Sequence, residues 1–374
     1  MNPRTVVITA GCALAAIGSA LGLGGRAWAI AHVRRWTGRP TLGFVSCDHC
    51  HGVSLERLPW AKSRPHHPSP AGLAISPDGA KLYVALYDLD QVVEVEVKSR
   101  AVRRRVPVPG RPTGLVLSPR THRLYVTCRD ADRLVALDTE TLRELETVQT
   151  GRGPVGLARC LTAAGERLVV ANSMSDDVSL LATAPLRELT RLAAGREPFA
   201  VASAPDGTRA WVANRLATTR RQDSVPASEL TVIDPGPARV VDRLRLESAH
   251  LSEGVCVVAG RKWTLLPLVK VRNLVPITQV ANGWVMSSGF AIAGPGGLIQ
   301  MPLDEANDYF ADPSGIAADA TGGRAFIASG GGDVISVVDL GKLAAWLRRS
   351  NQATRDDAIE DLALSPKYVI ARLP

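Results

Sequence analysis

The sequence predicts an all-β fold, a β-propeller built from four-stranded blades. A Pro-x-Gly turn recurs along the chain, and the third positions of its six copies are Gly72, Gly114, Gly156, Ala200, Gly254 and Gly315. These positions are separated by 42, 42, 44, 54 and 61 residues, and the shorter spacings match the length of one propeller blade. Each repeat also holds four short strand-like pieces that are bounded by turns.

The first repeat shows the expected strands most plainly. They cover residues 72–79, 82–85, 92–97 and 102–108. The third and fourth pieces alternate or are β-branched, as expected for strands that pack between neighbouring sheets. The Pro-Asp-Gly turn at 77–79 suits a tight connection, because proline fixes φ and glycine accepts a positive φ. The last expected strand, at 368–373, completes the sixth repeat.

Composition excludes several other classes of protein. Hydrophobic residues make up 46% of the 374 residues, which is enough to bury a large core and excludes intrinsic disorder. The 33 glycines and 25 prolines exclude a coiled coil. The formal charge of +8 comes from scattered arginines with few aromatic residues among them, which argues against a nucleic-acid partner.

Three stretches interrupt the later repeats. The polar stretch 215–228 is expected to be a surface loop, and 267–288 is a long apolar insertion. Residues 340–366 contain KLAAWLRR and AIEDLAL, which predict a helical insertion near the C-terminus. Such insertions are frequent sites of binding on propellers, or they are plain decoration.

The N-terminal residues are expected to direct the chain out of the cytoplasm. The run 6–25 is apolar, and Ala27-Trp28-Ala29 has the form of a signal-peptidase site. The alternative is an uncleaved membrane anchor, because the run is nearly long enough to span a bilayer. Either interpretation places the rest of the chain in the periplasm or another extracytoplasmic space. The expected organisation is 1–29 as signal or anchor, 30–67 as linker and 68–374 as propeller.

The linker carries the one chemical motif of the sequence, Cys47-Asp-His-Cys50-His51. The pattern Cys-x-x-Cys-His is a c-type haem attachment sequence, in which both thiols bond to the haem and the histidine binds its iron. Three alternatives remain open: a zinc or copper site that also uses His66 and His67, a local disulfide, or a remnant.

The sixth iron ligand has several candidates, namely His66, His67, His250, Met174 and Met286. Among them His250 is favoured, because it precedes an expected inner strand and should lie near one face of the propeller. The other cysteines of the repeats, Cys128, Cys160 and Cys256, fall at strand positions and are expected to be buried structural thiols.

The tetrapeptides LYVA (82–85) and LYVT (124–127) resemble the YVTN-type β-propeller repeat family. The resemblance covers about residues 68–374 and implies a seven-bladed ring, whereas six repeats are counted here. The ring therefore has six blades, lacks a seventh, or is closed with the help of residues 41–46. A ring that does not close would expose sheet faces.

Two stretches, 269–292 and 302–317, resemble propellers that are joined to c-type cytochromes of the dihaem peroxidase kind. In that subgroup the haem domain follows the propeller. Here no Cys-x-x-Cys-His occurs after residue 51, which counts against peroxidase activity for this chain by itself.

Together these features predict an exported propeller that carries haem c and transfers electrons, or serves as the partner module of a cytochrome or peroxidase system. Its partner would then be a redox or cell-envelope protein. The alternative is a cofactor-free binding or scaffold propeller. A lactonase-like enzyme is less favoured, because no arrangement of acid, base and nucleophile supports it.

Overall fold

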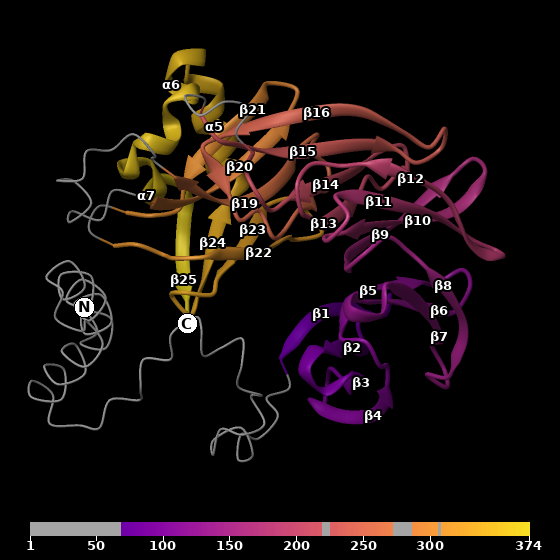
Figure 1. Cartoon of the computed structure of the whole chain (residues 1–374). Helices are drawn as coiled ribbons and strands as arrows, with labels where there is room; N and C mark the ends of the chain where they lie inside the picture. The colour runs from indigo at the N-terminus through magenta and orange to yellow at the C-terminus, as the bar shows by residue number, and fades with distance from the viewer. Residues whose placement is uncertain (1–68, 219–224, 272–285, 306–307) are drawn as a thin grey trace, which may run out of the picture. The chain divides into compact units, whose positions relative to one another are not determined.

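The computed structural model describes residues 69–218, 225–271, 286–305 and 308–374. The chain divides into two units, Met1–His67 and Pro68–Pro374, and all described residues belong to the second. This unit is all-β and holds six antiparallel sheets, which confirms the predicted fold class. Figure 1 shows the six blades in chain order, from indigo to yellow.

Each blade except the fifth is a four-stranded meander in which neighbouring strands are also consecutive in the chain. Blade 1 consists of β1 (Pro70–Ile75), β2 (Lys81–Leu86), β3 (Gln91–Glu96) and β4 (Ala101–Pro107). Blade 2 consists of β5 (Pro112–Ser118), β6 (Arg123–Cys128), β7 (Arg133–Asp138) and β8 (Glu144–Gln149). Blade 3 consists of β9 (Pro154–Thr162), β10 (Gly165–Asn172), β11 (Asp177–Thr183) and β12 (Leu186–Ala193). Blade 4 consists of β13 (Pro198–Ser203), β14 (Ala210–Asn214), β15 (Ala227–Asp234) and β16 (Arg239–Glu247). Blade 5 consists of β17 (Ala249–His250), β18 (Cys256–Val257), β19 (Thr264–Val271), β20 (Met286–Gly294) and β21 (Gly297–Pro302). Blade 6 consists of β22 (Pro313–Ala318), β23 (Arg324–Ser329), β24 (Val334–Asp339) and β25 (Val369–Leu373).

The first strand of each blade lines a central channel, except in blade 5, where the segment between β17 and β18 does so. A cavity of about 390 Å³ is bordered by the repeat residues Gly72, Gly114, Gly156, Ala200, Gly254 and Gly315. The recurring glycine has a steric reason. A Cβ at Gly72 would lie 2.0 Å from the carbonyl oxygen of Thr113 in blade 2, and one at Gly114 would lie 2.3 Å from that of Val155 in blade 3. At Gly72 and Gly114 the backbones of successive blades approach too closely for a side chain.

Blade 5 departs from this plan. Its inner edge consists of two short pieces, β17 and β18, which both pair with β19. The predicted insertion 267–288 is wrong at both ends, because its first residues belong to β19 and its last to β20. Both strands are nearly continuous apolar runs that are buried on two faces, so they show no alternation that would set them apart from the insertion.

The predicted helical insertion is confirmed between β24 and β25. It contains α5 (Leu340–Arg349), α6 (Gln352–Asp356), two short 3-10 turns (Ala358–Glu360 and Leu362–Leu364) and α7 (Ser365–Tyr368). Asp339 caps α5 by accepting hydrogen bonds from the backbone N–H groups of Gly341 and Lys342, both at 2.9 Å. The insertion packs against blades 5 and 6: α5 contacts β23 and β24, while α6 and the Ala358–Glu360 turn contact β21. Tyr368 of α7 meets Phe290 of β20 edge to face at 6.0 Å.

The junction between blade 6 and blade 1 differs from the other blade contacts. Leu73 and Ile75 of β1 are 64% and 58% exposed, whereas Leu115 and Leu157, at the position of Leu73 in the next two blades, are each 8% exposed. In blade 6 the paired residues Ile335 and Leu373 are exposed as well. Among the described residues, parts of the faces of blades 1 and 6 are therefore accessible.

No helix within the described ranges is both long and apolar enough to cross a membrane. The proposed signal or anchor at 1–29, the linker 30–67 and its Cys-x-x-Cys-His motif all lie outside these ranges.

Candidate functional site

Arg215 links blade 4 to blade 5 at one mouth of the central channel. It follows β14, and its Nη1 lies 2.8 Å from Oε1 of Glu197, just before β13. Its Nε lies 2.6 Å from Oε1 of Glu253, between β17 and β18. The guanidinium also lies over the ring of Phe199, 5.5 Å from the ring centre. A single cation thus joins two carboxylates from two blades.

A cavity of about 490 Å³ lies beside Arg215, and Asp312, just before β22, and Ser314 of β22 also border it. Burial disfavours the charge of Arg215, but its hydrogen bonds and attraction to Glu197 and Glu253 outweigh that effect and raise its pKa. Arg215 therefore stays protonated, and its positive charge affects the ionisation of the residues packed beside it.

His250 lies in β17, close to this cluster. Its Nδ1 accepts a hydrogen bond from the backbone N–H of Ala217 at 3.1 Å. Burial lowers the pKa of His250, the charge of Arg215 lowers it further, and Glu197 partly opposes both effects. The imidazole is thus held neutral, with its proton on Nε2.

This hydrogen bond bears on the predicted role of His250 as sixth iron ligand. To bind iron through Nε2, the ring would have to move its proton to Nδ1, and the bond from Ala217 would be lost. The other described candidates, Met174 and Met286, are exposed and lie in different blades. Cys47, Cys50, His51, His66 and His67 lie outside the described residues, so the ligand assignment remains a prediction.

The three cysteines of the propeller are free thiols, and Cys128 and Cys160 are fully buried. Burial raises the pKa of Cys128 to about 11. It raises the pKa of Cys160 and that of Cys256 to about 12. Such thiols are inert at neutral pH, as the structural role predicts. No cluster of three or more His, Cys, Asp or Glu side chains suited to a metal occurs in the part of the chain that the structure describes.

No known protein-family model matches the sequence. The YVTN-type and cytochrome-fusion resemblances therefore remain predictions. One curated relative is similar in sequence: hydrazine synthase subunit beta of Kuenenia stuttgartiensis. It is 29% identical over 183 residues, which cover 47% of this chain and 45% of the relative. The match thus spans less than half of the relative's length.

Solved structures extend the likeness over more of the chain. A Kuenenia stuttgartiensis hydrazine synthase chain superposes with a TM-score of 0.75 at 24% identity, covering 83% of this chain and 88% of that one. A streptogramin B lyase superposes with a TM-score of 0.53 at 14% identity, and the match covers 73% of this chain and 80% of the lyase chain. Virginiamycin B lyase from Staphylococcus aureus superposes with a TM-score of 0.51 at 13% identity, and the match covers 72% of this chain and 80% of the lyase chain. At these identities the structures show the shared propeller fold alone.

Sequence reasoning missed the Arg215 cluster. Arg215 stands at the start of a polar insertion, where an arginine is expected to be solvated, and Glu253 stands in an irregular segment. The available signal was positional: both residues adjoin inner strands, whose ends meet at one face of a propeller.

Replacing His250 with asparagine is expected to flatten the pH dependence of stability. The pKa of His250 is lowered by folding, so the unfolded chain binds more protons, and stability is lost as pH falls through the ordinary histidine value of 6.5. Asparagine keeps an acceptor for the Ala217 N–H but does not titrate. Thermal unfolding between pH 5.5 and 7.5 should show a smaller rise of Tm with pH in His250→Asn.

His122 supplies the control, because it is exposed and its φ of 52° suits asparagine. His122→Asn removes a histidine from another blade and serves as the reference against which the slope of Tm with pH in His250→Asn is compared. An equal slope in His250→Asn and the parent protein would contradict the assignment of a neutral His250.

Proposed function

We propose that this chain is a propeller subunit of an extracytoplasmic redox assembly and that it carries a c-type haem on Cys47, Cys50 and His51. The observation that carries the proposal is the match to hydrazine synthase subunit beta, in sequence over 183 residues and in fold over 83% of this chain. A subunit designated beta belongs to an enzyme with further subunits, and this supports a protein partner for the present chain.

The haem part of the proposal depends on the donor set in the linker. Two thiols separated by two residues, followed at once by an imidazole, provide both covalent attachment points and one axial ligand. When bound, the haem supplies an iron centre that gains and loses one electron. The buried cysteines of the propeller do not compete for it, because their raised pKa values keep them protonated.

Covalent haem is tested on the full chain, exported from a host with a c-type maturation system. We expect a Soret band and a mass increase equal to one haem. Cys50→Ala should lose the second attachment point, which changes the pyridine haemochrome spectrum and lowers the yield of haem protein several-fold. His51→Ala should remove the proximal ligand and lower that yield still further.

Cys128→Ala is the matched control, because Cys128 is a fully buried thiol within the propeller. It should keep a full complement of haem. A parent protein with neither a Soret band nor a haem mass would overturn the haem proposal. The subunit proposal would then stand as a cofactor-free scaffold, the alternative that the sequence left open.

The subunit proposal is tested separately from the haem. The chain, tagged and purified under mild conditions from the cells that produce it, should elute in a complex of defined stoichiometry, measured by native mass spectrometry. The complex should also contain at least one redox protein. Elution as a monomer of 39.7 kDa or less under all conditions would contradict the proposal.

A further inference from the structure

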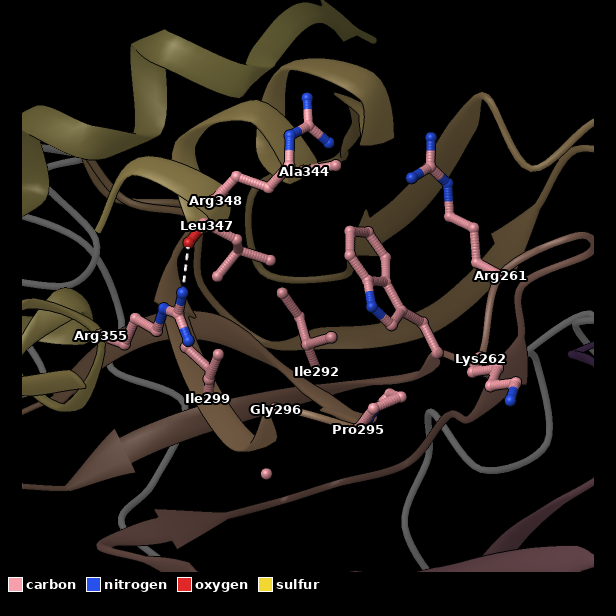
Figure 2. A pocket seen from close by; sticks show the side chains of 13 residues that line it. Arg261, Lys262, Ile292, Pro295, Gly296, Ile299, Ala344, Leu347, Arg348 and Arg355 are labelled. Carbon is pink, nitrogen blue, oxygen red and sulfur yellow. Dashed lines mark hydrogen bonds between the residues drawn. The ribbon is translucent and has the colours of Figure 1, made fainter. Parts of the chain in front are cut away.

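A third cavity lies away from the central channel and from Arg215, between blade 5 and the helical insertion. Its volume is about 410 Å³. One side is formed by β20, β21 and the turn between them, and the other by α5 and α6 (Figure 2). It exists only because the insertion of blade 6 packs against the strands of blade 5. Its volume lies within the range of small-molecule sites.

The floor of this cavity is apolar and rigid. Ile292 and Ile299 come from the two strands of the hairpin, and Leu347 comes from α5; all three are buried in the largest core cluster. Trp263, directly before β19, also borders the cavity. A flat apolar group could replace water on this floor without exposing any buried polar atom.

The rim of the cavity is cationic. Four basic residues border it, namely Arg261, Lys262, Arg348 and Arg355, and no carboxylate does. Among the described residues none of these four forms an ion pair. Their side chains surround the apolar floor from both sides, the first two from the β18–β19 turn and the other two from α5 and α6 (Figure 2).

Two of the arginines are already positioned by backbone contacts. Arg355 donates from Nη2 to the carbonyl oxygen of Leu347 at 2.6 Å, while its Nε is buried with no acceptor among the described residues. Arg261 donates from Nε to the carbonyl oxygen of Gly322 at 2.9 Å, and its guanidinium lies 5.0 Å from the centre of the Trp263 ring. Both cations are thus held at the cavity before any ligand arrives, so the binding of an anion needs little reordering of these two side chains.

We propose that this cavity binds a small amphipathic anion, a molecule with a flat apolar body and a carboxylate or similar acid group. The apolar body would lie on Ile292, Ile299 and Trp263, and the acid group would meet the cations of the rim. Free inorganic anions lack the body, and neutral aromatics lack the charge, so neither class uses both halves of the site. This binding is independent of the haem and of the subunit proposal.

The test uses a matched pair of probes on the full chain. The first, 8-anilinonaphthalene-1-sulfonate, has an aromatic body and an acid group; the second, N-phenyl-1-naphthylamine, has the same body without the acid group. We expect the sulfonate to bind at least tenfold more tightly. Energy transfer from tryptophan should accompany binding and be weakened, though not abolished, in Trp263→Phe, because the chain holds six further tryptophans. The carboxylate 2-naphthoate should displace the sulfonate, whereas inorganic phosphate should not.

Arg348→Gln is the diagnostic variant, and Arg349→Gln is its control. The two residues are adjacent, exposed and on the same helix, but only Arg348 borders the cavity. Arg348→Gln should weaken sulfonate binding several-fold, and Arg349→Gln should leave it unchanged. The proposal would be overturned if the protein bound the two probes with equal affinity or if the two variants weakened sulfonate binding equally. Displacement of the sulfonate by phosphate alone would also overturn it.

Discussion

Replacing Gly114 with alanine is expected to destabilise the propeller strongly. The new Cβ would lie 2.3 Å from the carbonyl oxygen of Val155 and 2.6 Å from Cδ2 of Leu157, both in the next blade. A backbone carbonyl in a packed sheet cannot move aside as a flexible side chain can. Overpacking of this kind costs about 1–3 kcal/mol or more, so urea unfolding should show a clearly lower midpoint.

Gly315 is the matched control, since it occupies the same repeat position in blade 6. A Cβ there would meet only the Cβ of Ala328, at 3.6 Å, which is ordinary van der Waals contact. Gly315→Ala should leave the midpoint unchanged or raise it slightly, because alanine restricts the unfolded chain by about 0.4–1 kcal/mol. Comparable losses in both variants would show that the glycine serves the strand itself and not the contact between blades.

The blades could be predicted from the sequence because each is a local unit. Its four strands are consecutive, its turns carry proline and glycine at fixed places, and the pattern recurs six times. The repeat even places the buried thiols, since Cys128 stands where the equivalent strands end in Asn172 and Asn214. Errors arose where strands are buried on both faces, as in β19 and β20, because a continuous apolar run carries no sign of where a strand begins.

The sites could not be predicted in the same way, because they depend on packing between units distant in sequence. Arg215 meets Glu253 only when blade 5 packs on blade 4. The cationic cavity needs Trp263 from blade 5 and Arg348 from the insertion of blade 6. No local pattern states that the helical insertion of blade 6 will pack against β20 and β21 of blade 5. The linker motif, in contrast, consists of five consecutive residues, 47–51, so its chemistry can be predicted without knowledge of the fold.

The exposed faces at the junction of blades 6 and 1 make a second strong prediction, because one side chain occurs in two environments. Leu73 and Leu115 hold the same position in consecutive inner strands. Leu115 is packed with Tyr83 and Ala85 of the preceding blade, within a cluster of buried residues. Leu73 is 64% exposed, whereas Leu115 is 8% exposed, so Leu73 is much less covered by a neighbouring blade.

Leu115→Ala should therefore lower the free energy of unfolding by about 2–5 kcal/mol, the usual cost of a cavity in a core. Leu73→Ala removes the same atoms from the same strand position and should change it by less than about 0.5 kcal/mol. Urea unfolding of the isolated chain measures both. A large loss in Leu73→Ala would mean that the face of blade 1 is covered in solution and that the ring is closed more tightly than the exposure of Leu73 indicates. Equal and small losses in both variants would instead contradict the packing of blade 2 on blade 1.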